Sequence, residues 1–184
     1  MNTNSVVVLV GPSGVGKDTL IDLIVARSEY CRFPVYTTRL VRDGEIDGVH
    51  YNFISHTHFA QLFDNNSLLE RFEVEGNFYG LCLDDLKIAL AKNKKLITHM
   101  SIEGLVKLKE SGVKLTSIWI QSPYPGAVMK RLRKRGLSEK EIVTRINHES
   151  TEEKFESLFD HTIVNHDYQQ EQVAISIINF LNKK

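Results

Sequence analysis

The chain has 184 residues, and 42% of them are hydrophobic, which is enough to build one well-buried core. Lysine plus arginine total 23, and so do aspartate plus glutamate, so the balanced charge does not favour a nucleic-acid or membrane-surface role. Two cysteines are too few for a disulfide framework, and no apolar run is long enough to cross a bilayer. We therefore expect a soluble, cytoplasmic protein in which any anion site is local.

The first predicted element is a strand over the apolar run Val6–Val10, which leads through a glycine-rich turn into a helix that includes Thr19 to Ile24. The turn has the spacing G-x-x-x-x-G-K between Gly11 and Lys17. Its glycines let consecutive backbone N–H groups point at an anion, and Lys17 can reach the outer phosphates of a nucleotide. The alternative is a plain glycine-rich turn, but the strand before it and the helix after it favour a phosphate-binding loop.

Asp18 stands where a serine or threonine hydroxyl normally meets Mg²⁺ in such a loop. We expect Asp18 or the neighbouring Thr19 to approach the metal, with several waters retained. The residues predicted to bind the nucleotide at the loop are Gly11, Ser13, Gly14, Val15, Gly16, Lys17, Asp18 and Thr19.

The rest of the chain alternates between strand and helix patterns. Strands are predicted at 34–38, 49–54, 68–74, 78–81, 95–100, 115–120 and 162–165. Helices are predicted after Ser55, at 83–91, 104–111 and 127–135, from Ser138, and at 171–181. This alternation around the loop implies a parallel sheet that is covered on both faces.

The stretch from Tyr36 to Phe53 contains T-T-R, then R-x-G-E, then G-x-x-Y-x-F. This order resembles the nucleotide-monophosphate-binding segment of guanylate kinases, and the resemblance covers most of the chain. It implies an α/β P-loop kinase fold, in which helices flank a parallel sheet and a small strand-rich insertion and a helical lid complete one domain. The implied segments are a core of 1–34, 83–125 and 160–184, an acceptor-binding region of 35–82 and a lid of 126–159.

Guanidinium groups suit a phosphorylated acceptor because they neutralise a dianion through bidentate hydrogen bonds. The resemblance implies that Arg39, Arg42, Tyr51 and Tyr79 hold the phosphate of the acceptor. It also implies that the positions near the sugar and base are Glu45, Glu70, Leu81 and Ser101. The alternative is a solvated loop for the arginines and strand-edge packing for the tyrosines.

A basic run from Lys130 to Arg135 is, taken alone, typical of a solvated helix face. By the resemblance, Arg131, Arg135 and Arg145 are lid arginines that close over ATP and, with Lys17 and Arg39, form the catalytic set. Asn165 resembles the position that borders the adenine.

Four positions depart from the guanylate kinase pattern: Val35 stands where the family has Ser, Leu81 where it has Ser or Thr, and His99 and Ser101 where it has two aspartates. Losing polar partners at a base-reading site costs about 1–3 kcal/mol for each buried group left unpaired. Features around Asp18, Arg39, Leu81 and Ser101 are also similar to ribose 1,5-bisphosphate phosphokinases.

The leading hypothesis is transfer of a phosphoryl group from ATP, with Mg²⁺, to GMP or dGMP. The first alternative keeps this chemistry and makes ribose 1,5-bisphosphate the acceptor. The second is a guanylate-kinase-like interaction module without activity, which typically lacks the phosphate loop and the lid arginines that this chain retains.

Overall fold

The structure is a computed structural model that describes residues 5–92, 95–147 and 157–183. In the helix that covers 139–147, it describes the side chains only through residue 143. The chain divides into two compact units. The first comprises Met1–Val8 and Tyr30–Thr116, and the second comprises Leu9–Glu29 and Ser117–Lys184. Hydrogen bonding gives a five-stranded sheet in the order β2-β7-β1-β8-β9 and a four-stranded sheet in the order β4-β3-β6-β5.

The strands lie close to where the sequence predicts them, with one addition. Their bounds are β1 Val6–Val10, β2 Tyr30–Arg32, β3 Val35–Thr37, β4 Tyr51–Phe53, β5 Phe72–Val74, β6 Asn77–Gly80, β7 Lys95–His99, β8 Leu115–Gln121 and β9 His161–Val164. The unpredicted strand is β2, which pairs in parallel with β7. All five residues of β1 are buried, as expected for a strand of a parallel sheet that is covered on both faces.

The helices also follow the predicted pattern. Their bounds are α1 Lys17–Arg27, α2 His56–Asp64, α3 Leu83–Ala91, α4 Ile102–Glu110, α5 Ala127–Lys134, α6 Glu139–Asn147 and α7 Gln170–Leu181. Ser55 caps α2 by accepting the backbone N–H of His58, as its position before the helix predicts. None of the helices in the described part of the chain has the length and apolar character that crossing a bilayer requires.

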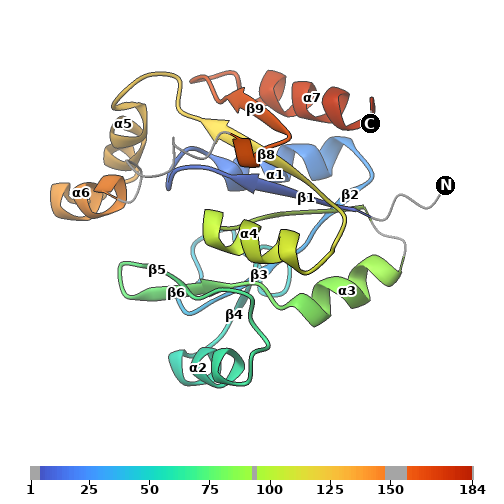
Figure 1. Cartoon of the computed structure of the whole chain (residues 1–184). Helices are drawn as coiled ribbons and strands as arrows, with labels where there is room; N and C mark the ends of the chain where they lie inside the picture. Colours follow the sequence, from blue (N-terminus) through green and yellow to red (C-terminus); the bar gives the residue numbers. More distant parts are fainter. Residues whose placement is uncertain (1–4, 93–94, 148–156, 184) are drawn as a thin grey trace. The chain divides into compact units, whose positions relative to one another are not determined.

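In the first unit, the small sheet of β3, β4, β5 and β6 (Figure 1) carries two of the residues expected to bind the acceptor, Tyr51 on β4 and Tyr79 on β6. Strand β3 pairs in parallel with β4 and antiparallel with β6, and β6 forms an antiparallel hairpin with β5. A cluster of Phe59, Leu68 and Cys82 packs α2 against this sheet. The pairing of β3 with β4 therefore fixes the spacing of the two ends of the segment between them, which begins with buried Thr38 and Arg39 and is mostly exposed from 40 to 49.

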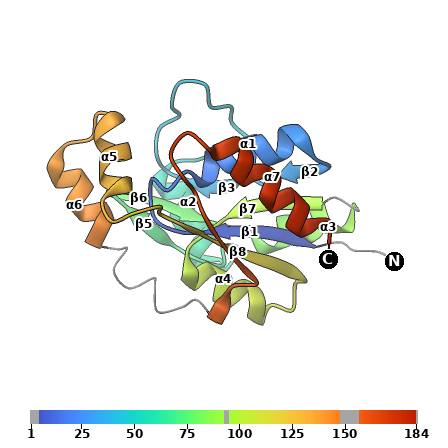
Figure 2. The same cartoon turned by 90° about the horizontal axis from the view of Figure 1, so that it is seen from above.

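In the second unit, α1 and α7 lie side by side, and α5 and α6 form an adjacent pair (Figures 1 and 2). Strands β8 and β9 pair in parallel over four residues, from Ile118 with His161 to Gln121 with Val164. Asp160, just before β9, accepts the backbone N–H and the hydroxyl of Ser117, each at 2.8 Å. These bonds fix where β9 starts and hence where its end lies.

Gly11, directly after β1, lies at a position of the second unit where the backbone of β8 approaches too closely for a side chain. A Cβ atom there would lie 2.4 Å from the carbonyl oxygen of Ile120, and the backbone φ is +153°. Gly112 has a φ of +75° with nothing within 4 Å of an added Cβ, so it shares the backbone strain but not the clash. We expect Gly11→Ala to lower the free energy of unfolding by about 2 kcal/mol more than Gly112→Ala does, measured by urea denaturation. Equal losses would show that the approach of Ile120 is unimportant.

Candidate active site

The loop after β1 folds around the ammonium group of Lys17. Its Nζ donates to the carbonyl oxygens of Gly11 at 2.6 Å and Pro12 at 3.0 Å. Gly14 and Gly16 have φ values of +88° and +104°, which residues with a side chain adopt only with strain. The loop thus places a cation beside the N-terminus of α1, a combination that binds anions.

The same two glycines allow other elements to approach the loop closely. A Cβ atom on Gly14 would lie 2.8 Å from Leu132 of α5, and one on Gly16 would lie 2.6 Å from the side-chain nitrogen of Asn165. That nitrogen donates to the carbonyl oxygen of Val15 at 2.7 Å. The loop is therefore shaped by α5 and by the end of β9 as well as by its own sequence.

Arg131 of α5 is held by three neighbours in the second unit. Its guanidinium donates to the carbonyl oxygens of Val15 at 2.8 Å and Asn165 at 2.6 Å, and its Nε donates to Asp167 at 2.9 Å. Asp167 also accepts the hydroxyl of Tyr124, and its bond to Arg131, followed by that to Tyr124, lowers the pKa of its carboxyl. Arg131 consequently ties α5 to the phosphate loop and to the segment after β9.

A cavity of about 400 Å³ opens beside the loop, a size typical of small-molecule sites. It is lined by Gly14, Gly16, Thr19, Lys130, Arg131, Lys134, Arg135, Asn165, Asp167, Tyr168 and Gln170. Four of these residues are cationic and one is anionic, so the lining favours an anion. Arg131 and Arg135 both reach the cavity, as their spacing on one face of a helix predicts.

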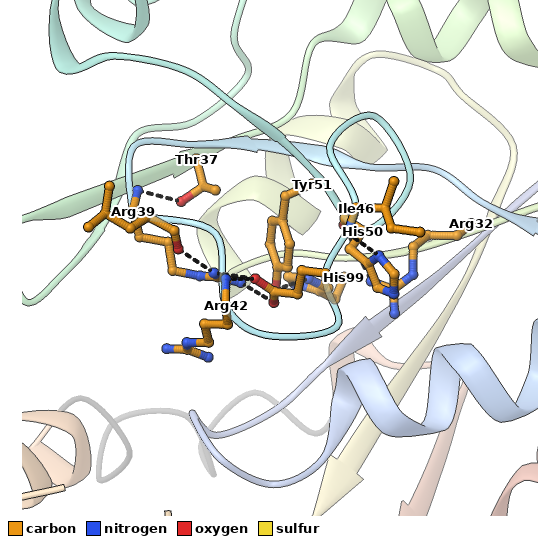
Figure 3. A network of polar contacts seen from close by, with 10 residues as sticks. Arg32, Thr37, Arg39, Arg42, Ile46, His50, Tyr51 and His99 are labelled. Carbon is orange, nitrogen blue, oxygen red and sulfur yellow. Dashed lines mark hydrogen bonds and ion pairs between the residues drawn. The ribbon is translucent and has the colours of Figure 1, made fainter.

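The first unit contains a second cationic centre, at Arg39 (Figure 3). The Arg39 side chain is only 7% exposed, and its two terminal nitrogens each donate to one oxygen of Glu45 at 2.6 Å. Burial by itself would lower the pKa of the guanidinium, but the bonds and charge of Glu45 raise it above its usual value. Burial would likewise raise the pKa of Glu45, whereas the hydrogen bonds from Arg39 and Arg42 lower it.

Aromatic rings surround this ion pair. The Arg39 guanidinium lies 4.6 Å from the ring centroid of Tyr51 and 5.3 Å from that of Phe53. The Tyr51 and Tyr79 rings lie 6.2 Å apart in an edge-to-face arrangement. Arg42 contributes its backbone N–H to Glu45 at 2.9 Å, while its exposed side chain extends away from the carboxylate (Figure 3).

Glu70 lies in a buried cradle at the start of α4 in the first unit. Glu70 is 3% exposed, its carboxylate accepts the Ser101 hydroxyl, and an added Cβ on Gly104 would lie within 2.5 Å of its oxygens. Burial raises the pKa of Glu70 to about 7, and the bonds from Ser101 offset only part of this shift. Glu70 and Ser101 thus form a hydrogen-bonded pair, and the absence of a side chain at Gly104 leaves room for the Glu70 carboxylate.

The structure brings some of the predicted acceptor residues together and separates others. Glu45, expected near the sugar and base, pairs with Arg39, which is expected at the phosphate. Leu81 is fully buried and Val35 nearly so, at 0% and 4% exposed, and the role of Leu81 at the acceptor stays a prediction. The side chain of Arg145 lies outside the described residues.

Two residues that contact predicted site residues in the structure were not predicted as site residues from the sequence. His99, noted only as a departure from the family pattern, contacts the Tyr51 hydroxyl. Asp167 accepts a hydrogen bond from Arg131, which lies 36 positions earlier in the sequence. A histidine in place of an expected aspartate was the only sequence signal for the first, and nothing in the sequence pointed to the second.

Comparison with known proteins identifies the family. A sequence model described as guanylate kinase matches residues 3–179. The chain belongs to the guanylate kinase family. The guanylate kinase of Wolinella succinogenes is 38% identical over 177 residues, covering 94% of this chain and 82% of the relative. That of Mycoplasmoides gallisepticum is 33% identical over 174 residues, covering 92% and 89%.

The fold agrees with this assignment. The crystal structure of guanylate kinase from Anaplasma phagocytophilum superposes with a TM-score of 0.71 at 27% identity, covering all of this chain and 87% of the other. The predicted α/β P-loop kinase fold is therefore confirmed, and the chain is a kinase of this family, which uses ATP as a substrate. The division into core, acceptor-binding and lid segments stays a prediction.

The raised pKa of Glu70 predicts a pH-dependent stability. The folded chain retains a proton up to a pKa of about 7, whereas the unfolded chain releases it near 4.5. Between these two values the folded state binds more protons, so the free energy of unfolding falls as pH rises through this window. Relative to Glu70→Gln, the wild type should lose about 3 kcal/mol between pH 4.5 and pH 8, measured by urea denaturation.

The control for this measurement is Glu73→Gln, because Glu73 is exposed on β5. Its stability should follow the wild-type pH curve. If Glu70→Gln also follows that curve, Glu70 titrates normally in the folded chain.

Proposed function

We propose that this kinase transfers the γ-phosphoryl group of ATP to the phosphate of GMP. The observation that carries the proposal is the Arg39 centre, because a buried guanidinium flanked by tyrosines suits a phosphorylated acceptor. The phosphate loop and the basic cavity beside it suit the triphosphate. The relatives named guanylate kinase support the choice of GMP.

In the proposed reaction, an oxygen of the acceptor phosphate attacks the γ-phosphorus. The bond from that phosphorus to the bridging oxygen of ADP breaks, and no covalent intermediate with the protein forms. Catalysis of such a transfer is mainly positioning and neutralisation of charge. Lys17 and the loop amides would stabilise the β- and γ-phosphates, and Arg39 with Arg42, Tyr51 and Tyr79 would hold the acceptor.

The proposed lid arginines differ in their surroundings. Arg131 is already bonded to Val15, Asn165 and Asp167, so we propose that it shapes the loop and faces the triphosphate from there. Arg135 is exposed and lines the cavity, from which we propose that it contacts the transferring group. Asn165, packed against Gly16, would border the adenine.

Mg²⁺ is part of the proposal. Asp18 and Thr19 are exposed at the start of α1, and Thr19 lines the cavity. A carboxylate and a hydroxyl are hard oxygen donors, which fit Mg²⁺ when waters and phosphate oxygens complete the set. When bound, the ion would neutralise charge on the phosphates. No cluster of three or more acidic, histidine or cysteine residues suited to a metal occurs in the described ranges.

Ribose 1,5-bisphosphate is the second candidate acceptor, and one observation favours it. Val35 and Leu81 are apolar and buried, which leaves Glu70 and Ser101 as the polar pair expected near a base. A sugar bisphosphate would need the phosphate-binding residues without a base-reading set. The kinase names of the relatives weigh against the non-catalytic module.

Formation of ADP from ATP with GMP, dGMP or ribose 1,5-bisphosphate tests the proposal. We expect GMP to give the highest kcat/KM, because the relatives that match most of this chain are named guanylate kinase. Turnover of the sugar bisphosphate without turnover of GMP would contradict the assignment of GMP.

Two lysine variants serve as controls for that assay. Lys17→Ala should lower kcat by about a hundredfold or more, since it removes a preorganised donor at the phosphates. Lys87→Ala, on the exposed face of α3, should leave turnover unchanged.

Asp18→Ala tests the proposed approach of Asp18 to Mg²⁺. If Asp18 orders the ion directly or through water, the Mg²⁺ concentration for half-maximal activity should rise by about tenfold at fixed ATP. Asp22→Ala, about one turn further along α1, is the matched control. An unchanged Mg²⁺ requirement would mean that Asp18 acts only as an acidic residue at the helix start.

A further inference from the structure

His99, the last residue of β7, lies against a tyrosine that the proposed acceptor site uses. Its Nε2 is 3.1 Å from the hydroxyl oxygen of Tyr51, and the two rings meet edge to face at 5.6 Å (Figure 3). Tyr51 and His99 are 48 positions apart, so the fold rather than local sequence creates the contact.

The position of the Tyr51 ring is fixed on several sides. Tyr51 is 4% exposed, and Arg39 lies over its face. The Phe53 ring is tilted against it at 5.7 Å, and the Tyr79 ring meets it edge to face at 6.2 Å. A ring held in this way keeps its hydroxyl oxygen in one place, so only the direction of the O–H bond can change. Whether His99 donates to this oxygen or accepts from it therefore affects where the proton points.

Two arrangements satisfy the contact between Tyr51 and His99. The phenol can donate to Nε2, or Nε2–H can donate to the phenol oxygen. A phosphate dianion has only acceptor oxygens, so it can use the phenol proton only in the second arrangement. In that arrangement the bond from His99 also polarises the phenol and strengthens it as a donor.

We propose that His99 is a positioning residue for the acceptor, donating from Nε2 to Tyr51 so that the Tyr51 hydroxyl donates to the acceptor phosphate. This inference rests on the proposed function, in which Tyr51 contacts that phosphate. The imidazole supplies a donor that a carboxylate, expected here from the family pattern, cannot supply. His99 thereby acts on the acceptor through Tyr51 and has no role at the ATP phosphates.

The test is a double-mutant cycle on Tyr51 and His99 with GMP as the varied substrate. His99→Leu removes the donor and should raise the KM for GMP by about threefold to tenfold, the range for one net hydrogen bond. The KM for ATP and the kcat should stay near wild type, because the loss is in acceptor binding. His99→Gln carries an amide nitrogen near the Nε2 position and should restore most of the affinity for GMP.

The Tyr51→Phe background decides whether His99 works through the hydroxyl. Once the hydroxyl is absent, adding His99→Leu should change the KM for GMP by less than about twofold, which is the sign of full coupling. An equal rise in both backgrounds would overturn the inference, as would a glutamine variant no better than leucine. Thermal unfolding midpoints of all variants identify any that lose affinity by misfolding.

Wild-type turnover separates this inference from the proposed function. If the wild type phosphorylates GMP and the cycle shows no coupling, only the role of His99 is wrong. If the wild type fails to phosphorylate GMP, the proposed function fails, and the same cycle is then measured as the Kd for GMP by calorimetry. Coupling in Kd would retain the role of His99 in acceptor binding, and no binding of GMP would overturn it.

Discussion

A guanidinium group removed from water needs an anion for its charge and acceptors for its N–H groups. Each unit of this chain contains one arginine that has an anionic partner and makes three hydrogen bonds. In the first unit, Arg39 has both oxygens of Glu45 and the carbonyl oxygen of Leu40. In the second unit, Arg131 has Asp167 and the carbonyl oxygens of Val15 and Asn165.

The two arginines serve different ends under our proposal. Arg131 links segments that are 116 and 34 positions away, so its charge keeps the phosphate loop, α5 and the end of β9 in register. Arg39 is buried and is bonded within the segment between β3 and β4, where Glu45 supplies the negative charge. The Tyr51 and Phe53 rings hold the Arg39 guanidinium in place, and an acceptor phosphate would replace Glu45 as its anionic partner. The Tyr51 and His99 pair then extends this preparation to the neighbouring hydroxyl donor.

Much of this fold follows from local patterns in the sequence. The apolar run at Val6–Val10 and the apolar period of 83–91 match a strand and a helix with the bounds predicted for them. Strand β2 was missed because it has three residues and none of them is fully buried, so it has no alternation to detect. The parallel pairing of β3 with β4 could not be predicted either, since it depends on contacts across an intervening loop.

Some features of the candidate site could likewise be predicted from the sequence, and others could not. The glycines of the phosphate loop are a local signal with its own mechanism, whereas the roles of Tyr51, Tyr79 and Glu70 came from resemblance to a family. The bonds from Arg131 to Asp167 and from Tyr51 to His99 join distant positions, and only the folded chain reveals them. The full burial of Leu81 is another property of packing that its sequence position does not disclose.

The central claim is that Arg39 is the anchor for the acceptor phosphate. A crystal structure of the protein with bound GMP tests it most directly. Our account predicts phosphate oxygens within about 3 Å of the Arg39 guanidinium and of the Tyr51 hydroxyl. A phosphate bound elsewhere, with both terminal nitrogens of Arg39 still closed on Glu45, would contradict it.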